Sequence, residues 1–236
     1  MFKGNKISLV IPAFNEQECI GTLLPGIPGF VDEVIVVDNG STDKTAEISK
    51  LNGASVIYEK RRGYGVSLKT GILTAQGDII ICLDADGSYP LTVIEDFLKL
   101  LTDNEYDFIS GQRINLNINN AMPLINRIGN KIISCLINLF FGIHLKDSQS
   151  GMWALKREIF NKIAPASPGM GFSQEIKIRA WLNPDIACYE TNIPYDRRLG
   201  GRSKFNRIQD SVTILYDVFY ILKEHYGLLQ YKKNNL

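Results

Sequence analysis

The sequence predicts an α/β fold in which helices cover both faces of a mostly parallel, Rossmann-like sheet. Three observations support this prediction: apolar β-branched runs recur through the first half of the chain, helix-compatible stretches separate them, and acidic or polar residues follow the ends of the runs. Parallel strands that are buried on both faces read as near-continuous apolar runs joined by helical crossovers. Ligands of such sheets bind outside the carboxyl ends of the strands, where these polar residues fall.

The expected strands are the apolar runs at residues 7–13, 33–38, 54–58 and 78–84. Helix-compatible stretches lie between them. Residues 41–43 form a helix-capping sequence before an expected helix at residues 46–51, and a further helix is expected at residues 65–75. Strand and helix therefore alternate, so that residues far apart in the chain meet at one edge of the sheet.

The regular alternation ends after the first half of the chain. A polar segment at residues 115–120, two apolar helical stretches, a turn rich in glycine and proline at residues 165–171 and a basic segment follow. We expect one domain, residues 1–236, in which residues 1–111 bind the main ligand and residues 112–236 complete the site.

Composition places the chain among globular proteins, with 45% hydrophobic and 22% charged residues in 236. A formal charge of +1 argues against a nucleic-acid partner, because domains that bind nucleic acid usually carry a basic excess. The four cysteines are scattered without a CxxC pair, so neither a zinc knuckle nor a disulfide framework is expected. The N-terminal run is too short for a secretory signal, which predicts a site that faces the cytoplasm.

Two apolar helical stretches are expected to lie on a membrane without crossing it. Residues 132–145 give about 14 residues and residues 212–222 contain Asp217, whereas a span needs about 20 predominantly apolar residues. These amphipathic helices are expected either to dock on lipid at the cytoplasmic face, to pack against each other, or to form the interface of a homo-oligomer. The sequence leaves these alternatives open.

Asp84-Ala85-Asp86 gives the strongest chemical signal in the sequence. The two carboxylates follow an apolar run, and side chains two residues apart in an extended chain point to the same side. Hard oxygen ligands placed in this way suit Mg²⁺ or Mn²⁺ that bridges a pyrophosphate. We therefore expect a divalent cation beside a bound diphosphate.

Asp38 also follows an apolar run, and two interpretations of it stay open. Residues 38–43 could form an ordinary turn and helix cap, and Asp38 could at the same time accept hydrogen bonds from a ribose or a base. No GxGxxG or GxxxxGK[ST] sequence is present, which argues against dinucleotide oxidoreduction and P-loop ATP hydrolysis. The two histidines show no spacing that suggests a hydrolase triad.

Several motifs in order resemble the family-2 glycosyltransferases with a GT-A fold, above all the dolichol-phosphate mannose and glucose synthases. The matching segments are residues 11–16 (IPAFNE), 37–43 (VDNGSTD), 62–65 (RGYG), 84–90 (DADGSYP), 111–113 (GQR), 126–127 (NR), 147–151 (DSQSG), 172–175 (FSQE) and 198–204. They cover nearly the whole chain. The resemblance implies an inverting enzyme that moves a sugar from a nucleotide-sugar donor to a polyprenyl or dolichyl phosphate.

The resemblance also implies roles for individual residues. The nucleotide pocket would be lined by Pro12, Ala13, Asn15, Glu16, Asp38, Gly63, Asp84 and Ala85. The metal ligands would be Asp84, Asp86 and Ser88. Acceptor phosphate and diphosphates would be bound by Arg113, Arg127, Arg198 and Lys204, with Asp86, Arg113 and Arg127 as the catalytic set. Arginine suits this work because its fork binds phosphate oxygens bidentately.

Alternatives remain for donor and acceptor. Relatives often carry Asp at the position of Asn39 and Gln at that of Ser88, so UDP-glucose, UDP-N-acetylglucosamine and GDP-mannose are all candidate donors. A phosphate acceptor is already ionised, whereas transfer to a glycan or protein hydroxyl would need a carboxylate base, for which Asp147 or Glu175 is available. An inactive module that binds nucleotide sugars is the third hypothesis.

Overall fold

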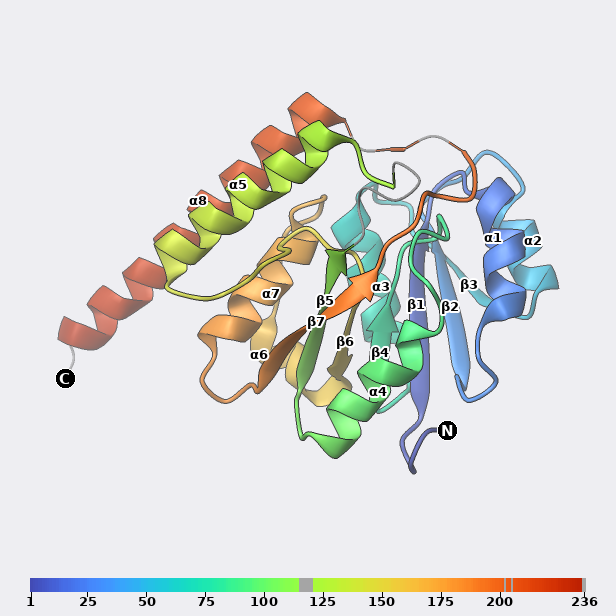
Figure 1. Ribbon diagram of the computed structural model, residues 1–236, viewed down its shortest axis with the longest axis horizontal. Helices are drawn as coiled ribbons and strands as arrows, with labels where there is room; N and C mark the ends of the chain where they lie inside the picture. Colours follow the sequence, from blue (N-terminus) through green and yellow to red (C-terminus); the bar gives the residue numbers. More distant parts are fainter. Residues whose placement is uncertain (115–120, 202, 205, 235–236) are drawn as a thin grey trace.

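The structure is a computed structural model that describes residues 1–114, 121–201, 203–204 and 206–234 (Figure 1). The polar segment at residues 115–120 and Arg202 lie outside this description. The expected α/β architecture is confirmed. Within the described part, the strands form one sheet in the order β3-β2-β1-β4-β6-β5-β7.

The strand bounds agree closely with the apolar runs in the first half of the chain. The strands are β1 (Ile7–Ala13), β2 (Glu33–Asp38), β3 (Ser55–Tyr58), β4 (Ile79–Cys82), β5 (Phe108–Ile114), β6 (Trp153–Lys156) and β7 (Cys188–Pro194). Neighbouring strands β1 to β4 are parallel, as are β5 and β7. Strand β6 lies antiparallel between β4 and β5, so the sheet is mixed at this one position in the described chain.

Helices cover both faces of the sheet, as the alternating pattern predicts. They are α1 (Gln17–Leu23), α2 (Thr45–Leu51), α3 (Tyr64–Thr74), α4 (Val93–Asp103), α5 (Leu124–Phe141), α6 (Phe160–Ile163), α7 (Phe172–Leu182) and α8 (Arg207–Asn234), with 3₁₀ turns at Leu24–Gly26 and Arg157–Ile159. One core cluster joins α1 and α4 to the sheet, and a second joins α3, α6 and α7 to the opposite face. This burial on both faces explains why the strands are apolar throughout.

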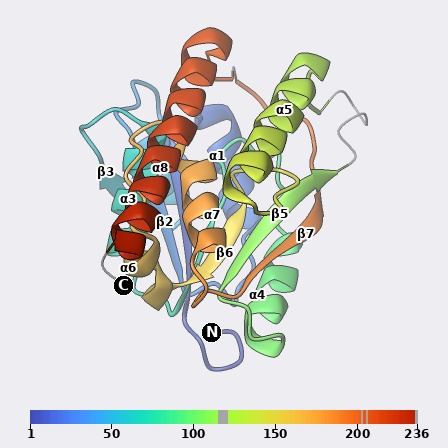
Figure 2. The same ribbon diagram turned by 90° about the vertical axis from the view of Figure 1, so that its left-hand side faces the viewer.

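Helices α5 and α8 form an outer layer over α7 (Figures 1 and 2). Both were expected to be shorter, and this expectation was wrong. Helix α5 begins after Pro123, includes Arg127 and Lys131, and ends at Gly142, whose φ of 66° terminates the helix. Charged residues do not end a helix when they face solvent, so the apolar stretch underestimated its length.

In the described chain, α5 alone is long and apolar enough to cross a membrane by length and composition, with 18 residues and a mean hydropathy of 1.2. Only 17% of it is buried. The helix includes Arg127 and Lys131, so it is longer than expected without containing a run of 18 uncharged apolar residues.

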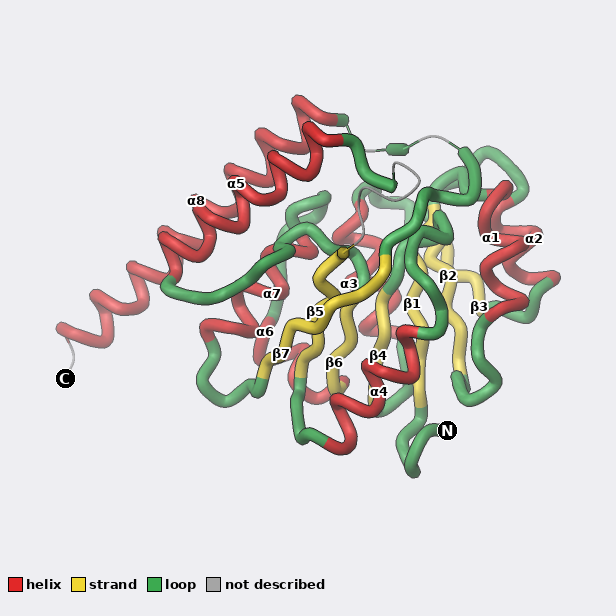
Figure 3. Tube along the Cα trace, in the orientation of Figure 1, coloured by secondary structure: helices red, strands yellow, loops and turns green. Residues whose placement is uncertain are grey.

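Strand register brings the polar strand ends to one edge of the sheet. Ala13 pairs with Asp38, and Cys82 lies opposite Trp153, so the residues after β4 and before β6 emerge together. Figure 3 shows the loops that follow β1, β2 and β4 gathered at this edge. We call it the carboxyl edge.

Candidate active site

Asp84 lies at the centre of the carboxyl edge, two residues beyond β4. The phenol of Tyr64, at the start of α3, donates a 2.8 Å hydrogen bond to Asp84 Oδ1. Burial and the nearby charge of Asp86 raise the pKa of Asp84 to about 6. The chain thus places two carboxylates close together in sequence at the end of one strand, and carboxylate oxygens are the donors that a hard divalent cation prefers.

Asp86 is oriented by the next turn. Its Oδ1 accepts hydrogen bonds from the Ser88 amide at 3.0 Å and from the Ser88 hydroxyl at 2.6 Å. Its Oδ2 lies 3.7 Å from Nη1 of Arg198. Ser88 is fully buried and its hydroxyl serves Asp86 in this structure. Direct contact between Ser88 and a metal stays a prediction.

The basic segment folds back onto the first loop of the chain. Nη2 of Arg198 lies 3.0 and 2.8 Å from the two carboxylate oxygens of Glu16. Lys204 Nζ donates to the Asn15 carbonyl at 3.1 Å and lies 3.9 Å from Glu16. Burial raises the pKa of Glu16, although the charge of Arg198 opposes this. Residues separated by more than 180 positions therefore meet beside Asp86.

The loop after β1 is locked to the loop after β2. Asn15 has a φ of 53°, and its side-chain Oδ1 accepts a hydrogen bond from the Thr42 amide at 2.8 Å. The Asn15 amide in turn donates to Ser41 Oγ at 2.9 Å. Asp38 accepts the Ser41 amide at 3.0 Å and is buried. Pro12, Ala13, Asn15, Glu16 and Asp38 are thus brought together, as the sequence predicts.

Asn39 has a role that sequence reasoning missed. Its Nδ2 donates to the carbonyls of Glu59 at 3.1 Å and Arg61 at 2.8 Å, and its Oδ1 accepts the Gly63 amide at 2.8 Å. A carboxylate could accept but not donate, so aspartate cannot reproduce these contacts. Asn39, where relatives often carry Asp, therefore holds the loop between β3 and α3 in place through its side-chain amide.

Gly63 is required by its surroundings. It has a φ of 145°, and a Cβ atom there would lie 2.2 Å from the carbonyl oxygen of Pro168. The same packing places Tyr64 next to Asp84, and Ala85 is buried beside it. The loops that carry Asp38, Gly63 and Asp84 consequently share one site.

Arg113 and Asp147 form a buried ion pair in the second half of the chain. Nε and Nη2 of Arg113 each lie 2.7 Å from Asp147 oxygens, and the side chains are 8% and 4% exposed. Burial opposes ionisation of Asp147, but the charge and hydrogen bonds of Arg113 outweigh it and hold the pKa at about 2. The guanidinium also lies over the Tyr195 ring, 5.3 Å from its centroid.

Arg127 lies in the first turn of α5. Asn130, one helical turn further, donates from Nδ2 to Asp147 Oδ1 at 2.8 Å. Residues three apart on a helix share a face, so Arg127 is on the same side of α5 as Asn130. Contact of Arg113 or Arg127 with an acceptor phosphate stays a prediction.

The carboxylates considered as bases for a hydroxyl acceptor are both engaged. Asp147 accepts from Arg113 and Asn130. Glu175 accepts the amides of Ala166 and Ser167 at 3.0 and 2.6 Å, and Arg179 Nε at 2.7 Å. Both carboxylates are thus already hydrogen-bonded to side chains or amides of the protein, which leaves them less available to a hydroxyl acceptor.

Lys177 is a second residue that sequence reasoning missed. It lies in α7, is fully buried, and donates from Nζ to the carbonyls of Asp147, Ser148 and Ser150 at 3.1, 3.3 and 2.8 Å. The available signal was a lysine between two isoleucines in a helix. A lysine in such an apolar setting needs internal partners.

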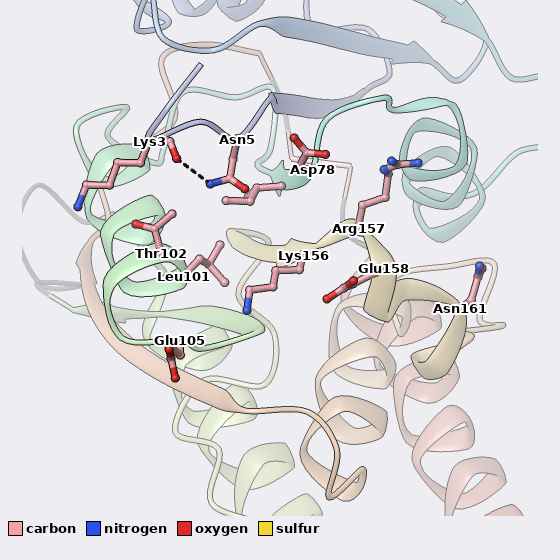
Figure 4. Close-up of a pocket in the computed structure, with 11 residues that line it drawn as sticks. Lys3, Asn5, Asp78, Leu101, Thr102, Glu105, Lys156, Arg157, Glu158 and Asn161 are labelled. Carbon is pink, nitrogen blue, oxygen red and sulfur yellow. Dashed lines mark hydrogen bonds between the residues drawn. The ribbon is translucent and has the colours of Figure 1, made fainter.

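A cavity of about 720 Å³ lies at the opposite edge of the sheet (Figure 4). It is lined by charged residues of both signs, among them Lys3, Asp78, Lys156, Arg157 and Glu158. None of the predicted site residues lines it. The chemistry of the carboxyl edge is therefore separate from this cavity.

Comparison with known proteins agrees with this geometry. The family described as Glycosyl transferase family 2 matches residues 8–164. A dolichyl-phosphate hexose transferase of Haloferax volcanii is 35% identical over 198 residues, which cover 82% of this chain and 84% of the relative. A UDP-N-acetylglucosamine–dolichyl-phosphate N-acetylglucosaminyltransferase of Methanococcus voltae is 30% identical over 174 residues, covering 64% of this chain and 69% of the relative.

Solved structures share the fold. Glucosyl-3-phosphoglycerate synthase from Mycobacterium tuberculosis, in complex with Mn²⁺, UDP-glucose and phosphoglyceric acid, superimposes with a TM-score of 0.70 at 25% identity, covering 93% of this chain and 80% of that one. Another structure of that enzyme contains Mg²⁺ and UDP. The GT-A fold expected from the motifs is confirmed.

Proposed function

The chain belongs to glycosyl transferase family 2, and we propose that it moves a sugar from a nucleoside diphosphate to a polyprenyl phosphate, with inversion at the anomeric carbon. The names of the archaeal relatives support a dolichyl-type acceptor and a hexose or N-acetylglucosamine donor. The solved neighbour acts on phosphoglyceric acid instead, so the acceptor is not determined by the fold.

The donor side of the proposal depends on Asp84 and Asp86. These carboxylates are the residues that would hold Mg²⁺ or Mn²⁺, and a divalent ion there would neutralise the charge of the departing diphosphate. The proposed nucleotide pocket is built from the loops after β1 and β2, with Asp38 and the Asn39-held loop at Gly63 on its walls. Uridine and guanosine donors both remain candidates.

Arg198 and Lys204 are proposed to bind the diphosphate. Their present partner is Glu16, and Arg198 is within 3.7 Å of Asp86. A diphosphate offers more negative charge and better bidentate geometry for the arginine fork than one carboxylate does. We therefore propose that Arg198 and Lys204 exchange Glu16 for the donor phosphates.

The observation that favours a phosphate acceptor is that the two carboxylates considered as bases are each paired with an arginine. Asp147 is committed to Arg113, and Glu175 to Arg179. A lipid phosphate carries its own negative charge and does not need a base, whereas a hydroxyl does. Arg113, locked by Asp147, and Arg127 in α5 would hold such a phosphate for in-line attack.

The outer helices support contact with a membrane. Apolar side chains are exposed along both of them, namely Leu124, Ile125, Ile128, Ile132 and Leu139 on α5 and Val212, Tyr216, Phe219, Tyr220 and Tyr226 on α8. Other apolar residues of the same helices pack inward on α7. Such two-sided apolar helices suit an interfacial position, and we propose peripheral binding at the cytoplasmic face. Association of two copies through this face is the competing outcome.

The proposal is tested by offering nucleotide sugars with Mn²⁺ or Mg²⁺ and comparing a short polyprenyl phosphate with soluble sugar acceptors. We expect transfer to the lipid phosphate and a β-linked product. An Arg127→Ala protein should show an increase in KM for lipid phosphate on the order of tenfold or more, because a charged hydrogen bond is worth about 1.5–3 kcal/mol. Because Arg127 is assigned to the acceptor phosphate, UDP affinity should stay within about twofold, well below the tenfold change that corresponds to about 1.4 kcal/mol.

Arg157→Ala, at the opposite edge, is the matched control and should behave as the wild type. Equal losses of donor and acceptor affinity in Arg127→Ala would contradict the acceptor assignment. Transfer to soluble sugars alone would favour the glycan or protein acceptor, and binding without turnover would favour an inactive module.

A further inference from the structure

Residues 147–151 belong to no helix or strand, yet all of them except the half-buried Gln149 are buried. Asp147, Ser148 and Ser150 are at most 3% exposed. Buried peptide groups need hydrogen-bond partners, and a segment without regular structure cannot supply them from its own backbone. Side chains from other elements must therefore hold this segment.

The amides of the segment are bound by three acceptors. Asp147 N donates to Glu190 at 3.0 Å, Ser148 N to Ser134 Oγ at 3.1 Å, and Gly151 N to the phenol oxygen of Tyr89 at 2.7 Å. The three acceptors lie in β7, in α5 and in the loop that follows β4. Three amides of the segment are thus bound by residues distributed around it.

The carbonyls of the segment converge on one residue. Lys177 Nζ lies 3.1 Å from the carbonyl oxygen of Asp147, 3.3 Å from that of Ser148 and 2.8 Å from that of Ser150. An ammonium group has three donors, so the match is complete. The three oxygens form what we call the carbonyl cradle, a site suited to a small cation.

Position 177 lies in the interior. Ile176 and Ile178 belong to core clusters on either side, and Lys177 itself is fully buried. Burial lowers the pKa of Lys177 to about 8, while the charges of Asp147 and Glu190 oppose this. Burying a cation costs free energy unless hydrogen bonds and opposite charges compensate for the lost water. The carbonyl cradle and the nearby carboxylates supply this compensation for Lys177.

The same segment touches both sides of the carboxyl edge. Asp147 holds Arg113 through two 2.7 Å contacts. Gly151 lies against Asp84, and a Cβ atom there would lie 2.5 Å from Asp84 Oδ2. A displacement of the segment would therefore move an acceptor residue and a metal-binding residue together.

We propose that Lys177 is a positioning residue, a tethered cation in the carbonyl cradle that fixes residues 147–151 and through them Arg113 and Asp84. The proposal rests on the proposed function only in taking Arg113 and Asp84 as site residues. Lys177 touches neither donor nor acceptor. Its contribution is made through the geometry of the segment.

The test is chemical rescue of Lys177→Ala. The truncation removes three methylene groups and the ammonium, which n-propylammonium replaces. We expect sugar transfer and UDP–Mn²⁺ affinity, measured by calorimetry, both to fall by tenfold or more. Addition of n-propylammonium at millimolar concentration should restore at least a third of each, and 1-propanol, of the same size but neutral, should not.

Lys156→Ala is the matched control, because its ammonium bonds Asp107 at 2.8 Å at the opposite edge. It should retain activity and show no response to the amine. Loss in Lys177→Ala that neither additive changes would overturn the proposal, as would equal rescue by propanol. If the Lys177→Ala protein does not fold, Lys177→Met is used in its place. A Lys177→Met protein whose UDP–Mn²⁺ affinity and transfer rate both lie within twofold of wild type would overturn the proposal.

Calorimetry keeps this result separate from the proposed function. A wild-type protein that binds UDP–Mn²⁺ but does not use lipid phosphate would refute the acceptor. The amine dependence of UDP–Mn²⁺ binding in Lys177→Ala would still decide the role of Lys177.

Discussion

Two aspartates of the candidate site, one in each half of the chain, have opposite electrostatic surroundings. Asp84, in the donor half, receives a hydrogen bond from the neutral Tyr64, and burial with Asp86 raises its pKa to about 6. Asp147, in the acceptor half, is also buried, but Arg113 holds its pKa at about 2. The two aspartates therefore have opposite preferences for charge, although burial disfavours the charged form of both.

The difference shows which carboxylates already have a cationic partner within the protein. The acceptor half supplies its own cations, since Arg113, Arg179 and Lys177 face carboxylates or carbonyls. In the described part of the chain, Asp84 accepts a hydrogen bond from the neutral Tyr64 phenol, and Asp86 has Arg198 at the longer distance of 3.7 Å, so this pair is the one proposed to take a cation from outside. Equivalent substitutions in the two halves should consequently have different effects, on function in one and on stability in the other.

The largest effect is expected from Asp86→Ala. If Asp86 holds the metal as proposed, its loss should reduce metal-dependent transfer by on the order of 10³-fold, or about 4 kcal/mol of transition-state stabilisation. Initial rates with saturating Mn²⁺ measure this. Asp103→Ala, whose carboxylate meets Lys3 at the surface, is the control and should keep full activity. Full activity in Asp86→Ala would remove the metal from the mechanism.

Asp147→Asn should be the most destabilising of these changes. It leaves the buried Arg113 charge uncompensated, which costs about 3–5 kcal/mol. Denaturant unfolding measures the loss. Asp107→Asn, in a more exposed pair with Lys156, should cost about 1 kcal/mol or less. Similar losses in both would show that burial of the Arg113 pair is unimportant.

The pH dependence of the same variant gives a second check. The pKa of Asp147 is lower in the folded protein than in the unfolded chain, so its contribution is fully present above about pH 4. It is lost as the pH falls towards 2. The stability difference between wild type and Asp147→Asn should therefore shrink over that interval.

Asn39→Asp should have an intermediate effect. The carbonyls of Glu59 and Arg61 would lose their donors, and each unsatisfied buried group costs about 1–3 kcal/mol. We expect weaker UDP binding together with lower stability, because the loop at Gly63 loosens. Unchanged UDP affinity would show that this loop does not shape the nucleotide pocket.

The smallest effect on stability is expected from Asp84→Asn. Removing a carboxylate whose pKa is raised should leave the metal-free protein as stable as the wild type, or more stable by about 1 kcal/mol. Transfer should nevertheless fall with Mn²⁺ present. Thermal unfolding in EDTA measures the first quantity. A loss as large as that of Asp147→Asn would break the contrast between the halves.

The sequence alone was sufficient for features that depend on local pattern. The expected bounds of β1 and β2 coincide with those observed, because a strand buried on both faces is apolar along its whole length. The convergence of Asp38 and Asp84 followed from parallel topology. Both inferences needed only short segments and the rule that parallel strands end at one edge.

The features that could not be predicted depend on long-range packing. Asn39 makes its contacts with a loop more than 20 residues later in the chain, at Gly63. Lys177 makes its hydrogen bonds with carbonyls of a segment about 30 residues earlier. The pairing of Glu16 with Arg198 spans 182 positions. No periodicity encodes such contacts, and the lengths of α5 and α8 were missed because exposed charges do not interrupt a helix.

The antiparallel strand β6 has a consequence for biosynthesis. It enters between β4 and β5 and pairs with both. A nascent chain that has released only the first half therefore presents the unpaired side of β4 to other molecules, an exposed edge of the kind that promotes aggregation. Strand β4 gains its second neighbour only after β6, which ends at Lys156, has left the ribosome. Truncation at residue 111 should therefore yield an aggregating fragment and not a smaller folded protein.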